Sequence, residues 1–187
     1  FFFINFKYYL TQMNYKRSKY FRTSSKKKIK YLFVKKRSQI AVVFFHGFMS
    51  DMIGAKPTAI QQFCAKHKLT FLKFEYSGHG RSSGKFIEGN ISGWTNEANE
   101  LIKSKIKKNI KLIFVGSSMG SWIALNLFSH FKNQIKGFIG ISSAPEFLEE
   151  LMWKKFSKKI KKIILSKKIY NLNYSGFSYP LTKQLIF

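Results

Sequence analysis

The stretch LIFVGSSMG, residues 112–120, joins an apolar run to a turn of small residues. The run predicts a buried strand, and the apolar residues 122–131 that follow predict a helix. Between them, Gly116-Ser117-Ser118-Met119-Gly120 fits the pattern G-x-S-x-G, in which a strained strand-to-helix turn exposes the central serine as a nucleophile. This context assigns the reactive hydroxyl to Ser118 and not to Ser117, with an ordinary turn of small residues as the alternative.

Further apolar runs on both sides of this stretch have the length and composition of strands. They lie at residues 31–34, 40–45, 69–74 and 138–141. Helices are predicted at residues 58–67, 94–107 and 122–131. Strands and helices that alternate at this spacing predict an α/β fold, with a mostly parallel sheet and flanking helices.

A second motif, His46-Gly47-Phe48, follows the run at residues 40–45. In a hydrolase site built on a strand-to-helix turn, the N–H after such a motif and the N–H after the nucleophile together hold the oxyanion. This predicts an oxyanion hole made by the backbone N–H groups of Phe48 and Met119. For His46 we expect a scaffolding role in the loop, and for His79 a role in a glycine-rich turn rather than as a catalytic base.

Three segments together resemble the α/β-hydrolase superfamily of serine hydrolases: residues 46–52, 76–84 and 116–120. Two later segments, residues 141–147 and 179–182, are similar to one branch of it. That branch contains the mitochondrial acyl-protein thioesterase that also cleaves acyl glucuronides, and its bacterial relatives. The resemblance implies an enzyme that cleaves carboxylic esters or thioesters, of a small molecule or an acylated protein, through an acyl-enzyme on Ser118.

The catalytic triad that the resemblance implies is incomplete in this sequence. After Ser118 there is no aspartate, the only acids are Glu146, Glu149 and Glu150, and the only histidine is His130. His130 falls in the predicted helix, more than about 15 Å from its start at 1.5 Å per residue, so it is too far away to act as the base. We expect the triad acid and histidine to be absent from this chain, as in an inactive fragment without its C-terminal strands. A pseudoenzyme is the alternative.

Composition narrows the class of protein further. A chain of 187 residues, 45% of them apolar, makes one domain with a real core. A single cysteine, Cys64, excludes an internal disulfide, and the histidines lack metal-site spacing, so neither a metal nor an organic cofactor is expected. The formal charge of +26 favours anionic partners. Because the excess is nearly all lysine spread along the chain, we expect weak contact with an anionic membrane surface and no specific nucleic-acid binding.

The predicted organisation is a basic, poorly ordered N-terminal extension at residues 1–29 and a hydrolase domain at residues 30–187, with a cap at residues 146–180. Within the cap, the isoleucines and lysines of residues 153–169 suit a lid over the site, a helix on anionic lipid, or a solvated helix packed on the sheet. The expected location is cytoplasmic, or mitochondrial in a eukaryote. The functional alternatives are a non-enzymatic basic module that binds anionic lipid or nucleic acid, and a hydrolase of peptidase or lactone-hydrolase specificity.

Overall fold

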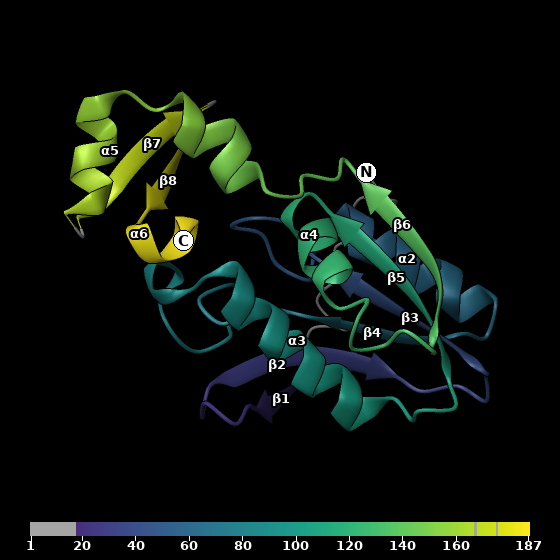
Figure 1. Cartoon of the computed structure of the whole chain (residues 1–187). Coiled ribbons are helices and arrows are strands. Elements are labelled where there is room, and N and C mark those ends of the chain that lie inside the picture. The colour runs from purple at the N-terminus through teal and green to yellow at the C-terminus, as the bar shows by residue number, and fades with distance from the viewer. Residues whose placement is uncertain (1–17, 167, 175) are drawn as a thin grey trace, which may run out of the picture.

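A six-stranded sheet with helices on both faces forms the body of the computed structural model, which describes residues 18–166, 168–174 and 176–187. The spatial order of its strands is β1-β2-β4-β3-β5-β6 (Figure 1). In chain order they are β1 (Lys19–Arg22), β2 (Lys28–Val34), β3 (Ile40–Phe45), β4 (Thr70–Phe74), β5 (Lys111–Ser117) and β6 (Ile135–Ile141). Strands β4, β3, β5 and β6 run parallel, while β2 is antiparallel to β4 and β1. The predicted α/β fold is therefore confirmed.

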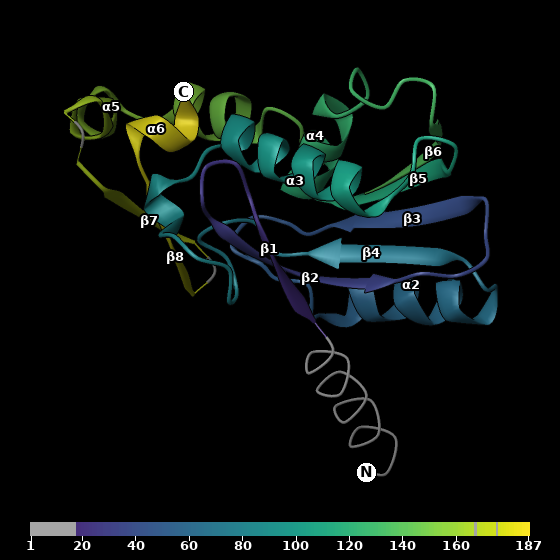
Figure 2. The ribbon, with the colours of Figure 1, turned by 90° about the horizontal axis from the view of Figure 1, so that it is seen from below.

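Helices cover the two faces unequally. Helix α2 (Ala55–Lys66) packs on one face, and α3 (Ile91–Lys105) and α4 (Met119–Asn126) pack on the other, as Figure 2 shows. The apolar stripe predicted for α3 is buried there, because Trp94, Ala98 and Leu101 recur at helical spacing and are all fully covered. Helix α4 ends five residues earlier than predicted, since the chain tightens into successive turns after Asn126.

Each face of the sheet has its own apolar core. On the α3–α4 side, Phe45 meets Phe74 and Phe114 edge to face, with ring centroids 5.6 and 5.0 Å apart. On the α2 side, Cys64 is buried against the sheet beside Phe71. Burial raises the pKa of the Cys64 thiol to about 11, which suits the packing role expected of it.

The sheet begins earlier in the chain than the sequence suggested. Strands β1 and β2 form an antiparallel hairpin, and β2 pairs in turn with β4, so residues 19–22 and 28–29 of the predicted extension are strand residues of this sheet. The alternation of lysines with apolar residues conceals this edge from a search for continuous apolar runs, although Ile29 is fully buried. Residues 1–17 of the predicted extension lie outside the described residues.

The segment after β6 forms a small unit of its own. Its elements are a π-helical turn η2 (Leu148–Met152), a 3-10 turn η3 (Trp153–Lys155), helix α5 (Lys158–Leu165), the antiparallel strands β7 (Tyr170–Tyr174) and β8 (Phe177–Leu181), and helix α6 (Lys183–Ile186). Thr182 Oγ1 donates to the Ile87 carbonyl in the 3-10 turn η1 (Phe86–Glu88), 3.3 Å away, which ties this unit to the main domain.

Helix α5 turns its apolar face inward. Ile164 is fully buried, while Lys158, Lys159 and Lys162 face solvent. The helix is also only eight residues long, where the sequence allowed an amphipathic stretch across residues 153–169. Ile164 is therefore packed against the protein itself, whereas Leu165 beside it is exposed. Within the described part of the chain, no helix is long and apolar enough to cross a membrane.

Candidate active site

Ser118 occupies the turn between β5 and α4 in a backbone conformation that side chains rarely adopt. Its φ and ψ are 51° and −121°, which for a residue other than glycine costs about 1–3 kcal/mol. Two hydrogen bonds hold the turn: Ser118 N–H donates to the Ile141 carbonyl at 2.9 Å, and Ser121 N–H donates to the Ser118 carbonyl at 2.9 Å. The half-buried Ser118 side chain thus stands at the strand-to-helix turn that the sequence predicted.

The glycines of the motif allow the strand and helix to approach this closely. A Cβ on Gly116 would lie 2.5 Å from Ser121 Cα, and one on Gly120 would overlap the backbone carbonyl oxygen of Phe45. Ser121 adds a polar clamp, because its Oγ donates to the Gly116 carbonyl at 2.9 Å. The small residues around Ser118 therefore allow the tight turn between β5 and α4 in which Ser118 lies.

The loop after β3 lies directly against this turn. A Cβ on Gly47 would lie 3.4 Å from Ser118 Cβ and 3.3 Å from the Ser117 carbonyl oxygen. Phe48 and Met119 each follow one of the two residues in contact, so their N–H groups belong to the two segments that meet at Ser118. Among the described residues neither N–H donates to a protein acceptor. Two unused donors beside a serine are what stabilisation of an oxyanion requires.

His46 fixes the orientation of that loop. It is buried, with Nδ1 2.8 Å from the Gly47 carbonyl oxygen and Nε2 3.4 Å from the Tyr76 N–H. Burial holds the pKa of His46 well below its usual range, so the ring is neutral, and the network assigns the proton to Nδ1. A trans peptide points its C=O and N–H in opposite directions, so anchoring the Gly47 carbonyl aims the Phe48 N–H away from His46. This is the scaffolding role expected from the sequence.

A pocket of about 410 Å³ opens at Ser118. Its walls are Gly47, Phe48, Ser50, Lys56, Ser117, Ser118, Phe147, Met152, Leu172, Tyr174 and Tyr179. The main domain supplies the polar wall, and the unit after β6 supplies an apolar and aromatic one. The Phe48 ring joins the two walls, with its centroid 5.3 Å from that of Phe147 and 6.0 Å from that of Tyr179. The walls from the two motifs and from the predicted cap at residues 146–180 were expected from the sequence, whereas Lys56 was not singled out there.

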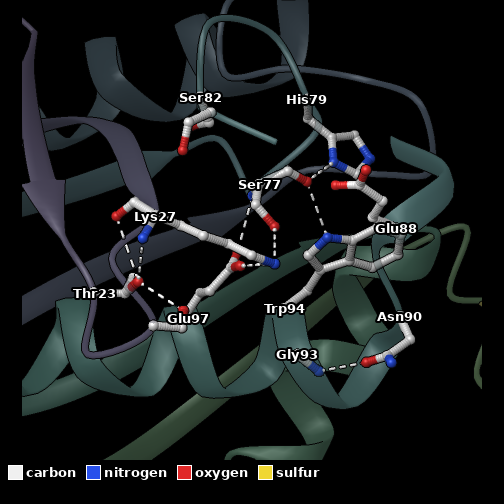
Figure 3. Close-up of polar contacts among 12 residues, drawn as sticks. Thr23, Lys27, Ser77, His79, Ser82, Glu88, Asn90, Gly93, Trp94 and Glu97 are labelled. Atoms are coloured by element: carbon white, nitrogen blue, oxygen red, sulfur yellow. Dashed lines mark hydrogen bonds and ion pairs between the residues drawn. The ribbon is translucent and has the colours of Figure 1, made fainter. Parts of the chain in front are cut away.

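The glycine-rich turn at residues 76–84 rests on a buried polar network, drawn in Figure 3. The Ser77 carbonyl accepts from Trp94 Nε1 at 3.0 Å, and His79 Nδ1 lies 3.2 Å from it. Ser77 N–H donates to Glu97 Oε2 at 2.9 Å, and Lys27 Nζ lies 3.5 Å from the other carboxylate oxygen. His79 is therefore a buried turn residue, as expected, and not a base at Ser118.

Burial lowers the pKa of His79 to about 4, which makes a prediction about pH. An unfolded histidine titrates near 6.5, so the unfolded state binds more protons between pH 6.5 and 4. The contribution of His79 to the free energy of unfolding is then complete above pH 6.5 and falls by roughly 3 kcal/mol as the pH drops to 4. Urea unfolding at pH 7, 5.5 and 4 should show a shallower decline for His79→Gln than for the wild type. Parallel curves for the two proteins would refute the assignment.

No triad partner meets Ser118 within the described part of the chain. Across residues 18–166, 168–174 and 176–187, no histidine or carboxylate is hydrogen-bonded to its Oγ. His130 is exposed and lines a different pocket, while Glu150 pairs with Lys154. Over those same residues, no three His, Cys, Asp or Glu side chains come together as a metal site would need.

Comparison with known proteins agrees with this architecture. The family model named Hydrolase_4, described as serine aminopeptidase, S33, matches residues 36–181, which is most of the chain. The chain belongs to this family of α/β-hydrolases.

Individual relatives extend the likeness. The mitochondrial palmitoyl-protein thioesterase ABHD10 is 31% identical over 105 residues in Rattus norvegicus and 30% identical over 107 residues in Homo sapiens. These alignments cover 56% and 57% of this chain but 35% and 34% of the relatives, so the matched part spans about a third of their length.

Solved structures resemble the chain over more of its length. A putative hydrolase from Agrobacterium vitis S4 superposes with a TM-score of 0.82 at 28% identity, covering 90% of this chain and 69% of the other. Alpha/beta hydrolase domain-containing protein 10 from mouse superposes with a TM-score of 0.78 at 23% identity, covering 90% and 67%. Both likenesses extend into the unit after β6, because they cover nine tenths of the chain.

Proposed function

We propose that this hydrolase cleaves carboxylic esters or thioesters through an acyl-enzyme on Ser118. The observation that carries the proposal is the turn itself: a serine held at positive φ, beside two backbone N–H groups without protein acceptors. The N–H groups of Phe48 and Met119 would hold the oxyanion, each contributing about 3 kcal/mol to lowering the barrier. An ordinary turn of small residues would have no need of the strained φ or the free donors.

The proposed reaction has two steps. Ser118 Oγ forms a bond to the acyl carbon while its proton passes through a base to the leaving oxygen or sulfur, and the bond from the acyl carbon to that atom breaks. Water then adds to the acyl carbon, the bond to Oγ breaks, and a carboxylic acid leaves as Ser118 regains its proton. The α4 N-terminus adds a positive dipole at the site of the developing charge.

The base and its orienting acid are not found near Ser118 among the described residues. We propose that a histidine and an acid from outside those residues complete the site, and that the described chain by itself turns over very little substrate. Removal of a catalytic base leaves only the oxyanion hole and substrate binding to accelerate the reaction.

The substrate class follows from the apolar wall and from the relatives. Phe147, Met152 and Leu172 line the pocket beside Ser118, so we propose that residues 146–180 form a cap whose inner face receives an acyl chain. The curated relatives are named as palmitoyl-protein thioesterases of mitochondria, which favours an acylated protein or a small acyl thioester, and a mitochondrial location in a eukaryote or a cytoplasmic one in a bacterium. Exposed lysines of α5 would add weak attraction to an anionic membrane surface.

Covalent labelling tests the proposal against a non-enzymatic basic module. The full-length gene product should react with a fluorophosphonate, and mass spectrometry should place the adduct on the peptide that contains Ser118. Prior incubation with an S-acyl thioester should slow the labelling. A protein that stays unlabelled, yet binds anionic vesicles or nucleic acid with steep salt dependence, would favour the alternative.

The family description supplies a second candidate, a peptidase. The model that matches residues 36–181 is described as a serine aminopeptidase, and an acyl-enzyme on Ser118 serves amide as well as ester substrates. Turnover of aminoacyl amides faster than of matched acyl thioesters would favour this candidate.

A further inference from the structure

The pocket at Ser118 has a charged residue on only one side. Of the described residues that line it, Lys56 alone carries a charge, and it belongs to the polar wall with Gly47 and Ser50. The opposite wall comes from the unit after β6 and is apolar or aromatic. A substrate in this pocket would meet aliphatic and aromatic groups on one side and a single ammonium on the other.

The position of Lys56 is unfavourable for the stability of its own helix. It is the second residue of α2, and no acidic residue accompanies it in the first turn. A positive charge there opposes the helix dipole, which favours anions at the N-terminus. Lys56 is exposed, and within the described ranges none of the ion pairs found includes it, so no carboxylate lies within 4 Å of its ammonium.

We propose that Lys56 selects substrates whose leaving half carries a carboxylate or a phosphate. This inference rests on the proposed function, because it concerns the same pocket and the same acyl transfer to Ser118. The acyl chain lies against Phe147, Met152 and Leu172, and the anionic group of the leaving half lies against the Lys56 ammonium. Lys56 acts on binding and takes no part in bond making.

Three esters with one acyl group test this selection on the full-length protein. Phenyl octanoate has a neutral leaving group. The leaving group of 4-(octanoyloxy)benzoate carries a carboxylate, and that of 4-(octanoyloxy)phenyl phosphate carries a phosphate. Lys56→Met should lower kcat/KM for the two anionic esters roughly tenfold, through KM, and leave the neutral ester unchanged. Lys56→Glu should lower it further, and added salt should reduce the difference between wild type and variant. A loss confined to one anionic ester identifies which group Lys56 binds.

The matched control is Lys66→Met, at the other end of the same helix. This variant lowers the net charge of the protein by the same amount, but Lys66 does not line the pocket. All three esters should therefore react as with the wild type. Equal losses for all three esters with Lys56→Met, or the same pattern with Lys66→Met, would overturn the inference while leaving the hydrolase intact. If the wild type cleaves none of the esters and no acyl thioester, the proposed function itself fails, and this inference with it.

Discussion

Replacing Ser118 by alanine in the full-length protein should lower kcat for an acyl thioester by about a millionfold, the usual effect of removing a triad serine. The change removes the proposed nucleophilic oxygen, while the unused N–H groups of Phe48 and Met119 stay in place. Substrate binding should therefore change little. Fluorophosphonate labelling should disappear together with turnover, as shown by gel fluorescence and stopped assays on the same preparations.

Two control variants, Ser104→Ala and Ser117→Ala, test whether the loss of activity is specific to Ser118. Ser104→Ala makes the same chemical change near the end of α3, where Ser104 Oγ donates to the Leu101 carbonyl, and it should retain wild-type activity and labelling. Thermal unfolding should show that Ser118→Ala is folded, because the turn is held by backbone bonds to Ile141 and Ser121 and not by the hydroxyl. Substantial activity in Ser118→Ala, or loss of labelling in Ser117→Ala alone, would refute the assignment of the nucleophile.

The sequence predicts the centre of this fold better than its edges. The central strands β3 and β5 each have a continuous apolar run that is visible locally, and β4 has one interrupted only by the buried Lys73. The edge strand β1 has no such run, because Lys19 and Arg22 flank only two aromatic residues and the strand is stabilised by pairing with β2. The helix at residues 122–131 was overextended because its apolar residues continue into turns that still pack on the core.

The same contrast holds within the candidate site. The conformation of Ser118 is set by glycines next to it in the sequence, so the motif alone locates it. The pocket walls depend on contacts between distant parts of the chain, such as those of Phe48 with Phe147 and Tyr179. A local sequence pattern cannot predict which distant residues make these contacts. Lys56 is one of many lysines in a lysine-rich sequence, and only the folded pocket distinguishes it.

Gly120 should be the least replaceable residue of the turn. A Cβ there would overlap the backbone carbonyl oxygens of Phe45 and His46, at the end of a central strand that cannot move without its two neighbours. Gly120→Ala should therefore lower the free energy of unfolding by about 3 kcal/mol or more, measured by urea titration. Gly137→Ala in β6 is the matched control. Its Cβ would lie 3.8 Å from the Ile113 side chain, an ordinary contact, so its unfolding midpoint should stay near that of the wild type.

The position of the overlap also predicts how a folded fraction of Gly120→Ala would behave. The His46 carbonyl belongs to the loop that carries the Phe48 N–H, so any shift that relieves the overlap moves one proposed oxyanion donor relative to Ser118. Below the unfolding transition, kcat should therefore fall more than the folded fraction does, because a donor displaced by even 1 Å loses most of its effect on the transition state. Wild-type kcat per folded molecule in this variant, or an unfolding midpoint equal to that of Gly137→Ala, would show that β3 and α4 are not packed as closely as the turn requires.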